Sequence, residues 1–568
     1  MNPVKEKVLS TPKGGGIPNI PEEEIAQMIL SKFEVLKNQR ANWEDLWERV
    51  TEYVLPNRSD ITETHTPGAR QDERITDYTA VRANERFASG LYGYMCRPDE
   101  QWFKLMSNVQ EVINDEDSQR WFQAVEHIMM KNIYLSNFSL EIHEDFLDLG
   151  AVGTSCMYIE EGDEYPLRFK NFHITQYVIE ESAHGMIDTV IVEFKYSCKQ
   201  AIQAFGWENL PENIQKAWTE AKGGQSKQYF TFLHAVKPRL NIRKNALGKE
   251  AMPFMSVYIE KESKTIVKRG GYKTLPYVVA RFIKDPNEIY GRSPAINSLG
   301  EIYMVNAMKN TIIKSARKTV SPPMAVAHNS VLNSPKFDAG RIVYVKGSVF
   351  QDKPVPLQVT GDIRIGLEMI QQEQNSIKEA FYTDMFDYLI GGKYMTATEV
   401  EARKQSKLFL FAPILARIQS EKLNRILQRV FDILMTNGFF PPLPDALKRN
   451  PQYDIQFTGR MALALQNIEV SATQLTLGMI QPLAQYDPTI LDNFDWNAIA
   501  RGTARSNGMP IAFVKTKEQV ALEREARAAQ QKQMMDMQMA QMGADTAEKL
   551  GKPIDDSSLM AQSMQEEE

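Results

Sequence analysis

The chain has 568 residues, and its 43% hydrophobic and 10% aromatic content is typical of a globular protein, with a length that suggests about four modules. A formal net charge of -6 and a pI near 5.9 exclude the overall basic footprint of a tight nucleic-acid binder. A protein that contacts DNA weakly and lets the DNA slide past it is still compatible with this charge.

The cysteines and the apolar runs exclude further classes. Cys96, Cys156 and Cys198 are far apart, so we expect buried thiols in a reducing compartment and neither a disulfide nor a metal site. The start, "MNPVKEKVLSTPKGGG", has no apolar core and is not expected to be a signal peptide. No stretch approaches ~18 consecutive apolar residues, so no membrane span is expected.

The N-terminal part predicts helices. Residues 1–24 are expected to be flexible, and the stretch up to Pro56 then has the apolar spacing of a helix. A polar, loop-like segment follows. The stretch "ITDYTAVRANERFASGLYGYM" predicts a second helix, with Asp77 or Thr79 as its N-cap.

A third helix is predicted over "SLEIHEDFLDLG". Its apolar face carries Ile142, Phe146 and Leu149. Its acidic face carries Glu141, Glu144, Asp145 and Asp148. With His143 this face could be interpreted as a metal site, but we predict a solvent-exposed face.

From about residue 154 to residue 283 the pattern changes to short β-rich segments separated by Gly, Pro and charged turns. Most of the histidines lie in or near this half of the chain, none at a metal-ligand spacing: His127, His143, His173, His184 and His234. No G-x-S-x-G motif and no paired carboxylates stand out. We therefore expect no catalytic site, no metal and no cofactor.

Two long helices are predicted next, over residues 291–320 and 363–386, each about 35–45 Å long. Between them, residues 321–362 are punctuated by Pro and Gly and contain the strand-like "RIVYVKG". This order predicts a helical hairpin with a small β tip.

A basic face lies at the end of the first long helix, where Lys314, Arg317 and Lys318 share one side. Two interpretations remain open. The cations offset the negative end of the helix, or they contact DNA.

Residues 389–406 read "LIGGKYMTATEVEARKQS" and at first suggest a nucleotide-binding loop. A Walker motif fails because Asp387 stands at its first glycine and Tyr394 at its Ser or Thr position. We predict instead a mobile loop over residues 387–395, in which Gly391 and Gly392 act as a hinge. Lys393 of this loop is then a candidate for transient phosphate contact, the alternative being a solvated lysine.

A third long helix is predicted immediately after this loop. Thr396 as N-cap and Glu399 complete a capping box, and the periodic pattern continues to about residue 438. Pro413 removes a backbone donor in mid-helix, which predicts a kink.

The C-terminal part divides into three stretches. Residues 445–515 predict a strand-like segment and short helices. Residues 516–545 are rich in Ala, Gln and Met and predict a protruding helix between subunits, the alternative being an adaptable Met surface. Residues 546–568 are predicted to be disordered.

Several stretches together resemble one protein family. They are "WEDLWERVTEYVLP", "ITDYTAVRANERFASGLYGYM" with "WFKL" after it, "DLGAVGTSCMYIE", "GRSPA", "SPP" and "MTATEVEARKQS". Over roughly residues 25–510, their order is similar to that of the portal, or head-to-tail connector, family of short-tailed bacteriophages.

The resemblance implies a mainly α, α+β portal-type fold whose tunnel loop contains Gly391, Gly392, Lys393 and Tyr394. The implied parts are a wing (25–290), stem helices (291–320 and 363–386), a clip (321–362), a tunnel loop (387–395), a kinked helix returning to the wing (396–444), a crown (445–515) and a barrel-like C-terminal helix (516–545).

The implied function is a ring, usually of twelve subunits, through which double-stranded DNA is packaged, retained and ejected at one capsid vertex. The implied partners are the terminase large subunit, a tail adaptor or tail tube protein, the major capsid and scaffolding proteins, and internal core or ejection proteins. The implied location is the virion, after assembly in the host cytoplasm. The alternative is another virion structural protein, a minor capsid or internal protein without a DNA channel.

Overall fold

The computed structural model describes residues 22–62, 66, 68–69, 71–97, 101–107, 109, 111–112, 115–220, 228–239, 248–322, 324–327, 342–345, 355–356, 363–385, 411–449, 454–457, 476, 478, 494–497, 499–500, 503 and 517–550. They fall in two compact units, divided between residues 462 and 463. Helices predominate over strands among them, as the sequence predicted. None of the described helices is long and apolar enough to cross a bilayer.

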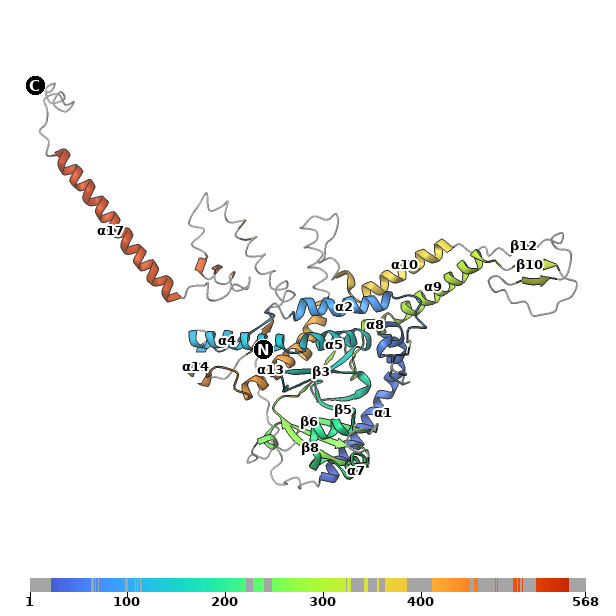
Figure 1. Cartoon of the computed structure of the whole chain (residues 1–568). Coiled ribbons are helices and arrows are strands. Elements are labelled where there is room, and N and C mark those ends of the chain that lie inside the picture. The colour runs from blue at the N-terminus through green and yellow to red at the C-terminus, as the bar shows by residue number, and fades with distance from the viewer. Residues whose placement is uncertain are drawn as a thin grey trace, which may run out of the picture. The chain divides into compact units, whose positions relative to one another are not determined.

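The first unit opens with helices (Figure 1): α1 (Glu22–Val54), α2 (Thr79–Met95), α4 (Glu116–Leu135) and α5 (Phe138–Val152). Helix α1 ends before Pro56 as predicted, but it begins at Glu22, so the last residues of the expected flexible N-terminus are helical. The N-cap of α2 is Tyr78 and neither of the two predicted residues, although Asp77, directly before it, accepts a hydrogen bond from the backbone N of Thr79 (2.8 Å).

The acidic face of α5 is the main difference from the prediction. Ile142, Phe146 and Leu149 are buried, as expected. Asp145 and Asp148, however, are only 0% and 4% exposed, so the prediction of a solvent-exposed acidic face was wrong for these two. The physical reason is that other parts of the chain cover this face and supply cations to it, as described below.

Two antiparallel sheets follow α5. The smaller has the order β3-β2-β9, built from β2 (Thr154–Glu160), β3 (Arg168–Phe172) and β9 (Tyr277–Arg281). The larger has the order β4-β5-β6-β7-β8, built from β4 (Tyr177–Glu181), β5 (Ile187–Ser197), β6 (Tyr229–Pro238), β7 (Phe254–Glu260) and β8 (Thr265–Tyr272). These strands confirm the predicted β-rich region.

Alternate side chains of the larger sheet pack against different helices, as a strand period of two requires. Leu233 and Ile259 pack in one core cluster with Ile29 and Phe33 of α1. Phe230 and Phe232 pack in another with residues of α6 (Cys198–Phe205) and α7 (Glu212–Glu220). The β-rich pattern did not predict α6 and α7, although a capping box of Ser197 and Gln200 begins α6.

His234 lies inside this core and not at a metal site. Its Nδ1 is 2.6 Å from the Tyr277 hydroxyl, its Nε2 is 2.9 Å from Ser256 Oγ, and its ring stacks on Tyr258. Burial lowers the pKa of His234 to about 3, so the ring stays neutral at physiological pH. The three cysteines are also buried and free, as predicted.

A helical hairpin continues the first unit. Its elements are α8 (Pro294–Asn297), α9 (Leu299–Val320), β10 (Met324–Ala327), β11 (Ile342–Val345), β12 (Val355–Pro356) and α10 (Ile363–Ala380). Helices α9 and α10 lie side by side, and a Cβ on Gly366 would meet Ile312 at 3.1 Å. Strand β10 pairs parallel with β11 and antiparallel with β12. We call α9 and α10 the stalk.

The boundaries of the stalk helices differ from the prediction at both ends. Ser293 caps the separate short helix α8, so the long helix starts at Leu299 instead of residue 291. Helix α10 ends at Ala380 instead of residue 386, and Tyr382 follows with a φ of 56°, which is incompatible with a continuing α-helix.

The later part of the first unit returns to the N-terminal helices. Residues 411–418 are helical and continue through a π-helical turn, η5 (Gln419–Leu423), into α13 (Asn424–Thr436) and then α14 (Asp445–Arg449). Strand β13 (Asp454–Phe457) pairs with β1 (Phe103–Met106), which lies in the "WFKL" stretch. The start of the expected crown, residues 445–457, thus belongs to the unit that contains the expected wing.

In the second unit, α17 (Lys517–Leu550) confirms the predicted C-terminal helix. It continues to Leu550, so residues 546–550 are helical and not part of a disordered tail. The predicted tunnel loop, its capping box and the helix before residue 411 lie outside the described residues.

Two glycines make the contact between the end of α5 and the segment that leads to the stalk. Gly153 ends α5 with a φ of 79°, and a Cβ there would be 2.4 Å from the carbonyl oxygen of Gly291. Thr154 Oγ1 accepts a hydrogen bond from Gly291 N (2.8 Å), and Ser293 Oγ donates one to Ala151 O (2.7 Å). The "DLGAVGTSC" and "GRSPA" stretches therefore meet through their backbones.

We predict that Gly153→Ala lowers the free energy of unfolding of the first unit by about 3 kcal/mol, because left-handed strain and overpacking add. Gly93→Ala in α2 is the matched control, since a Cβ there meets nothing within 4 Å and alanine favours a helix. Urea unfolding followed by tryptophan fluorescence measures both. A Gly153→Ala midpoint equal to that of Gly93→Ala would contradict the close contact.

Candidate functional site

The structure places some of the predicted site residues. Lys314 and Arg317 are exposed and Lys318 is half-buried in the last turns of α9, so the three form one basic surface. Ser321 N donates to Arg317 O (2.9 Å), as expected at a helix end. Both interpretations of this surface remain open. Pro413 lies in the described helical segment 411–418, and its kink stays a prediction. The candidate loop residues 391–394 lie outside the described part.

Asp77 fastens both stalk helices to the N-terminus of α2. It is 3% exposed, and its Oδ2 accepts hydrogen bonds from Lys309 Nζ of α9 (2.9 Å) and from Gln374 Nε2 of α10 (2.8 Å). Burial tends to raise the pKa of Asp77, but the hydrogen bonds from Thr79, Lys309 and Gln374 outweigh burial and lower it below its usual value. The carboxylate therefore stays ionised at the base of the stalk.

Asn306 completes this anchor from within α9. Its Oδ1 accepts hydrogen bonds from the backbone N of Thr76 and of Asp77, each at 2.9 Å. Thr76 Oγ1 donates to Asn306 O (2.8 Å). Hydrogen bonds of backbone and side-chain groups and one ion pair thus hold the base of the stalk against the start of α2.

A buried ion pair connects the π-helical turn to α5. Lys422 and Asp145 are both 0% exposed and form a salt bridge. Ser155 Oγ donates to Asp145 Oδ2 (2.7 Å), and Lys422 Nζ also donates to Val278 O (3.2 Å). Burial raises the pKa of Asp145, against the opposing effect of Lys422 and Ser155.

The neighbouring residue makes a second ion pair, with β9. Arg281 donates from Nη2 to Glu421 Oε1 (2.9 Å) and from Nε to Glu421 Oε2 (3.1 Å). The side chain of Arg281 is only 2% exposed. We call Asp145, Arg281, Glu421 and Lys422 the charge clamp.

Arg281 extends the charge clamp to the β4–β5 hairpin. Its guanidinium also contacts Glu181 and donates to Gly185 O (3.0 Å). Lys284 Nζ donates to Glu181 Oε2 (2.7 Å). A continuous chain of charges therefore runs from the π-helical turn to the edge of the larger sheet.

The other buried acid of α5 has its own cation. Arg58 contacts Asp148 and Glu144, each at 2.8 Å, and Asn171 Nδ2 donates to Asp148 Oδ2 (2.7 Å). His173 Nε2 lies 3.0 Å from Arg58 O, and burial lowers the pKa of His173. The sequence analysis missed all of these pairs, because Arg58 is 90 residues from Asp148 and Lys422 is 277 residues from Asp145.

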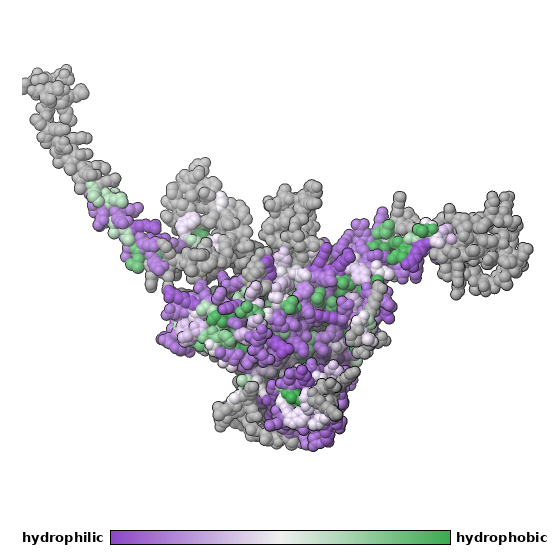
Figure 2. Space-filling model, viewed as in Figure 1, coloured by the Kyte–Doolittle hydropathy of each residue, from purple (hydrophilic) through white to green (hydrophobic). Residues whose placement is uncertain are grey.

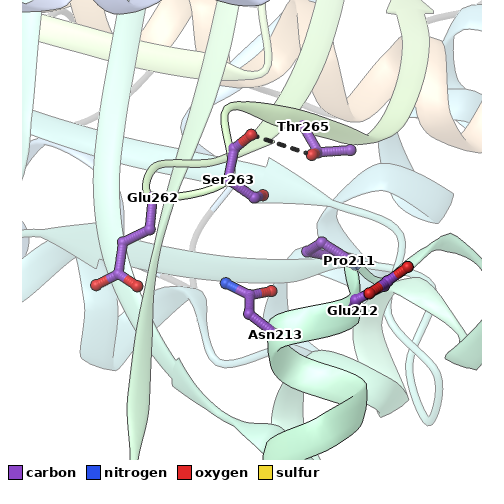
Figure 3. A pocket seen from close by; sticks show the side chains of 6 residues that line it. All are labelled: Pro211, Glu212, Asn213, Glu262, Ser263 and Thr265. Atoms are coloured by element: carbon purple, nitrogen blue, oxygen red, sulfur yellow. Dashed lines mark hydrogen bonds between the residues drawn. The ribbon is translucent and has the colours of Figure 1, made fainter.

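One hollow on the surface has an acidic lining. Figure 3 shows an open hollow between the start of α7 and the β7–β8 turn, lined by Pro211, Glu212, Asn213, Glu262, Ser263 and Thr265. Two carboxylates and no cation line it, so it is unsuited to phosphate groups. Within the described ranges, no three His, Cys, Asp or Glu side chains are grouped to hold a metal ion. The contacts described above join the helix 411–436 to α5 and β9, and the stalk to the start of α2.

Known proteins resemble this chain along most of its length. A family model described as "Bacteriophage head to tail connecting protein" matches residues 26–514. The chain is 27% identical over 535 residues to the portal protein of Salmonella phage epsilon15, covering 92% of this chain and 95% of that protein. It is 25% identical over 537 residues to a probable portal protein of Bordetella phage BPP-1, covering 93% and 96%.

One solved structure is a chain from the virion of a native gene transfer agent particle. It is 11% identical, and the match covers 76% of this chain and 95% of that one, with a TM-score of 0.34.

We predict that Lys422→Met lowers the free energy of unfolding by about 3–5 kcal/mol, because it leaves the Asp145 carboxylate buried without a partner. Adding Asp145→Leu should restore most of the loss, since both charges are then absent. Lys216→Met, which removes only an exposed pair with Glu212, should change stability by at most about 0.5 kcal/mol. Urea unfolding distinguishes these outcomes, and a double variant no more stable than Lys422→Met would contradict the pairing.

Proposed function

The chain belongs to the bacteriophage head to tail connecting protein family, and on this premise we propose that it is a portal subunit. In this proposal, copies of the chain form a ring at one capsid vertex, through which double-stranded DNA is packaged, retained and ejected. The observation that carries the proposal is the alignment with two proteins named as portal or probable portal, which spans more than nine-tenths of each chain.

The stalk supports this assignment. We assign α9 and α10 as stem helices and residues 321–362 as a clip, which would meet the terminase large subunit and later the tail adaptor or tail tube protein. A small sheet that follows one long helix and precedes another is suited to display such a docking surface. The anchor at Asp77 and Asn306 would hold the stem at a fixed angle to the wing.

The stalk surface also supports assembly. Figure 2 shows apolar patches on the described part of the stalk. The large apolar side chains exposed there, by 37–87%, are Met304, Ile313, Val320, Ile365, Leu367 and Met369. Apolar surface of this extent on a soluble protein marks an interaction site, and in a ring the neighbouring subunits would cover it.

The charge of the chain suits a conduit. DNA carries one charge per ~1.7 Å, so a strongly basic channel would hold it too tightly to let it pass. A chain with net charge -6 that offers a few cations, at Lys314, Arg317 and Lys318, would make weak contacts that salt screens. We propose the same for Lys393 in the loop 387–395, which Gly391 and Gly392 would let move.

The remaining parts follow from the same proposal. The wing would comprise residues 25–290, and the helix that bears Pro413 would lie behind the tunnel loop. A crown would begin after residue 462 instead of residue 445, because β13 pairs with β1. The chain would have no catalytic site or cofactor. It would reside in the virion after cytoplasmic assembly with capsid and scaffolding proteins, and would also meet internal core or ejection proteins.

We predict that the purified protein forms a ring with a mass near twelve times 64.8 kDa. Native mass spectrometry and negative-stain images over a range of protein and salt concentrations test this. A stable monomer under all these conditions would instead favour a virion structural protein without a channel.

We predict that replacing Lys314, Arg317 and Lys318 together by Gln weakens the binding of duplex DNA to the rings. It should also flatten the dependence of log affinity on log salt, since fewer counterions are released. Lys216→Gln on α7 is the control. Unchanged DNA binding with a lower melting temperature would leave these cations only the role of stabilising the end of α9.

A further inference from the structure

The edge strands of the smaller and larger sheets differ in whether side chains bind their outer backbone groups. An edge strand presents a row of N–H and C=O groups without a neighbouring strand, and this row can pair with another chain. The edge strands are β3 and β9 in the smaller sheet and β4 and β8 in the larger one (Figure 1).

At the β3 edge, two side chains of the first turns of α5 bind the backbone. Asn137 Oδ1 accepts a hydrogen bond from Phe169 N (2.9 Å), and Asn137 Nδ2 donates one to Phe169 O (2.8 Å). Glu141 Oε2 accepts a hydrogen bond from Asn171 N (2.7 Å). The side chains of α5 thus take the place of a further strand.

The edges β9 and β4 are bound in the same way. On β9, Glu421 Oε2 accepts a hydrogen bond from Arg281 N (3.1 Å). On β4, the buried Arg40 of α1 donates from Nη1 to Tyr177 O (2.7 Å). A strand from another chain would have to displace these groups.

The pairing of β7 shows which backbone groups of β8 point away from the sheet. Lys261 N, directly after β7, donates to Thr231 O (3.0 Å), so the odd-numbered residues of β7 face β6. Its even-numbered residues face β8, where Tyr258 is opposite Lys268. The outward groups of β8 are therefore those of the residues that alternate with Lys268, namely Arg269 and Gly271.

The outer edge of β8 is open in the described part of the chain. No hydrogen bond between described residues reaches the outward groups of Arg269 or Gly271. Arg239 Nη2 donates to Gly270 O (3.0 Å), which is on the inner side. The short helix η4 (Gly248–Ala251) lies next to β8, but no backbone hydrogen bond of the described residues joins the two.

Positive charge gathers along this open edge. Residues 264–273 read "KTIVKRGGYK", with four cations and no carboxylate. Lys268 and Arg269 are both exposed. Lys268 lies on the face of Tyr258, and Arg269 lies on the face of α1, where its Nη1 is 3.8 Å from Glu22 Oε1. Each face of the sheet therefore has a cation at the edge.

The charge decides which chain fits this edge. If β8 of a second copy paired with it antiparallel, Lys268 and Arg269 of both copies would gather in one pair of strands, and like charges across a pair destabilise it. A strand with two adjacent carboxylates would instead place one carboxylate on each face. Acidic side chains thus complement the edge, while a second copy does not.

The glycines of β8 leave room for the backbone of such a strand. A Cβ added at Gly270 would meet nothing within 4 Å. Glycine within a strand weakens the strand and often marks a place where another backbone approaches closely.

We propose that the outer edge of β8 binds an extended acidic segment of another protein, which adds as a sixth strand to the five-stranded sheet. The backbones of Arg269 and Gly271 supply about four hydrogen bonds. Lys268 and Arg269 select carboxylates, one on each face. This inference goes beyond the proposed function and does not depend on it.

Fluorescence anisotropy with the full-length assembled protein tests the inference. The probe is a short, blocked and labelled peptide with two central glutamates between alternating threonines and valines. It should bind at least tenfold more tightly than the same peptide with two central lysines. Methylation of its backbone amides, which removes hydrogen-bond donors and keeps the charges, should abolish binding. No binding of the acidic peptide, or equal binding of its methylated form, would overturn the inference.

Variants of Arg269 separate the backbone from the charge. Arg269→Pro removes the outward N–H without loss of a hydrogen bond inside the sheet, and should weaken peptide binding at least tenfold. Arg269→Gln removes only the cation and should weaken it about threefold. Lys216→Gln on α7 is the control and should change nothing.

Equal binding by Arg269→Pro and Arg269→Gln would show that only the charge attracts the peptide and would overturn strand addition. Pairing of two assemblies that Arg269→Pro abolishes would show that a second copy occupies the edge, which also overturns the inference. If Arg269→Pro does not assemble, the methylated peptide decides.

Discussion

The buried ion pair of Asp145 and Lys422 constrains the rest of the first unit. Neither side chain has solvent contact, and a single buried charge without a partner costs several kcal/mol. The helix 411–436 must therefore return across the chain to lie against α5. Its own apolar face packs over the smaller sheet, so the buried ion pair and the buried apolar surface together hold this helix in place.

Helix α5 is the element on which the other contacts converge. In the middle of α5, Asp145 forms an ion pair with Lys422, and one turn later Asp148 forms one with Arg58. At the end of α5, Gly153 contacts Gly291, which precedes the stalk. Asp77 then fastens α9 and α10 to α2, which packs on α5. Polar contacts of this kind add little net stability but favour one arrangement of the elements that they join.

The sequence predicted elements with a strong local pattern. The helices α1 and α2, the β-rich region, the helical hairpin with its small sheet and the long C-terminal helix all follow from apolar periodicity and turn residues. The capping box of Ser197 and Gln200 also marks the start of α6, directly after a β-rich stretch. The burial of Asp145 and Asp148 could not be predicted, because a helical pattern shows the polarity of its own face and not the cations that cover it. The π-helical turn η5 follows from no pattern recognised in the sequence, and the ion-pair partners of its residues, Arg281 and Asp145, lie far away in the chain.

The most direct measurement is a three-dimensional reconstruction of the purified protein at side-chain resolution. Our account predicts a closed ring in which α9 and α10 of every subunit surround a central opening. In each subunit, the ammonium of Lys422 should contact the Asp145 carboxylate of the same chain, with Glu421 on Arg281. An assembly without a central opening, or a ring in which Lys422 faces solvent and the helix 411–436 has left α5, would contradict the account.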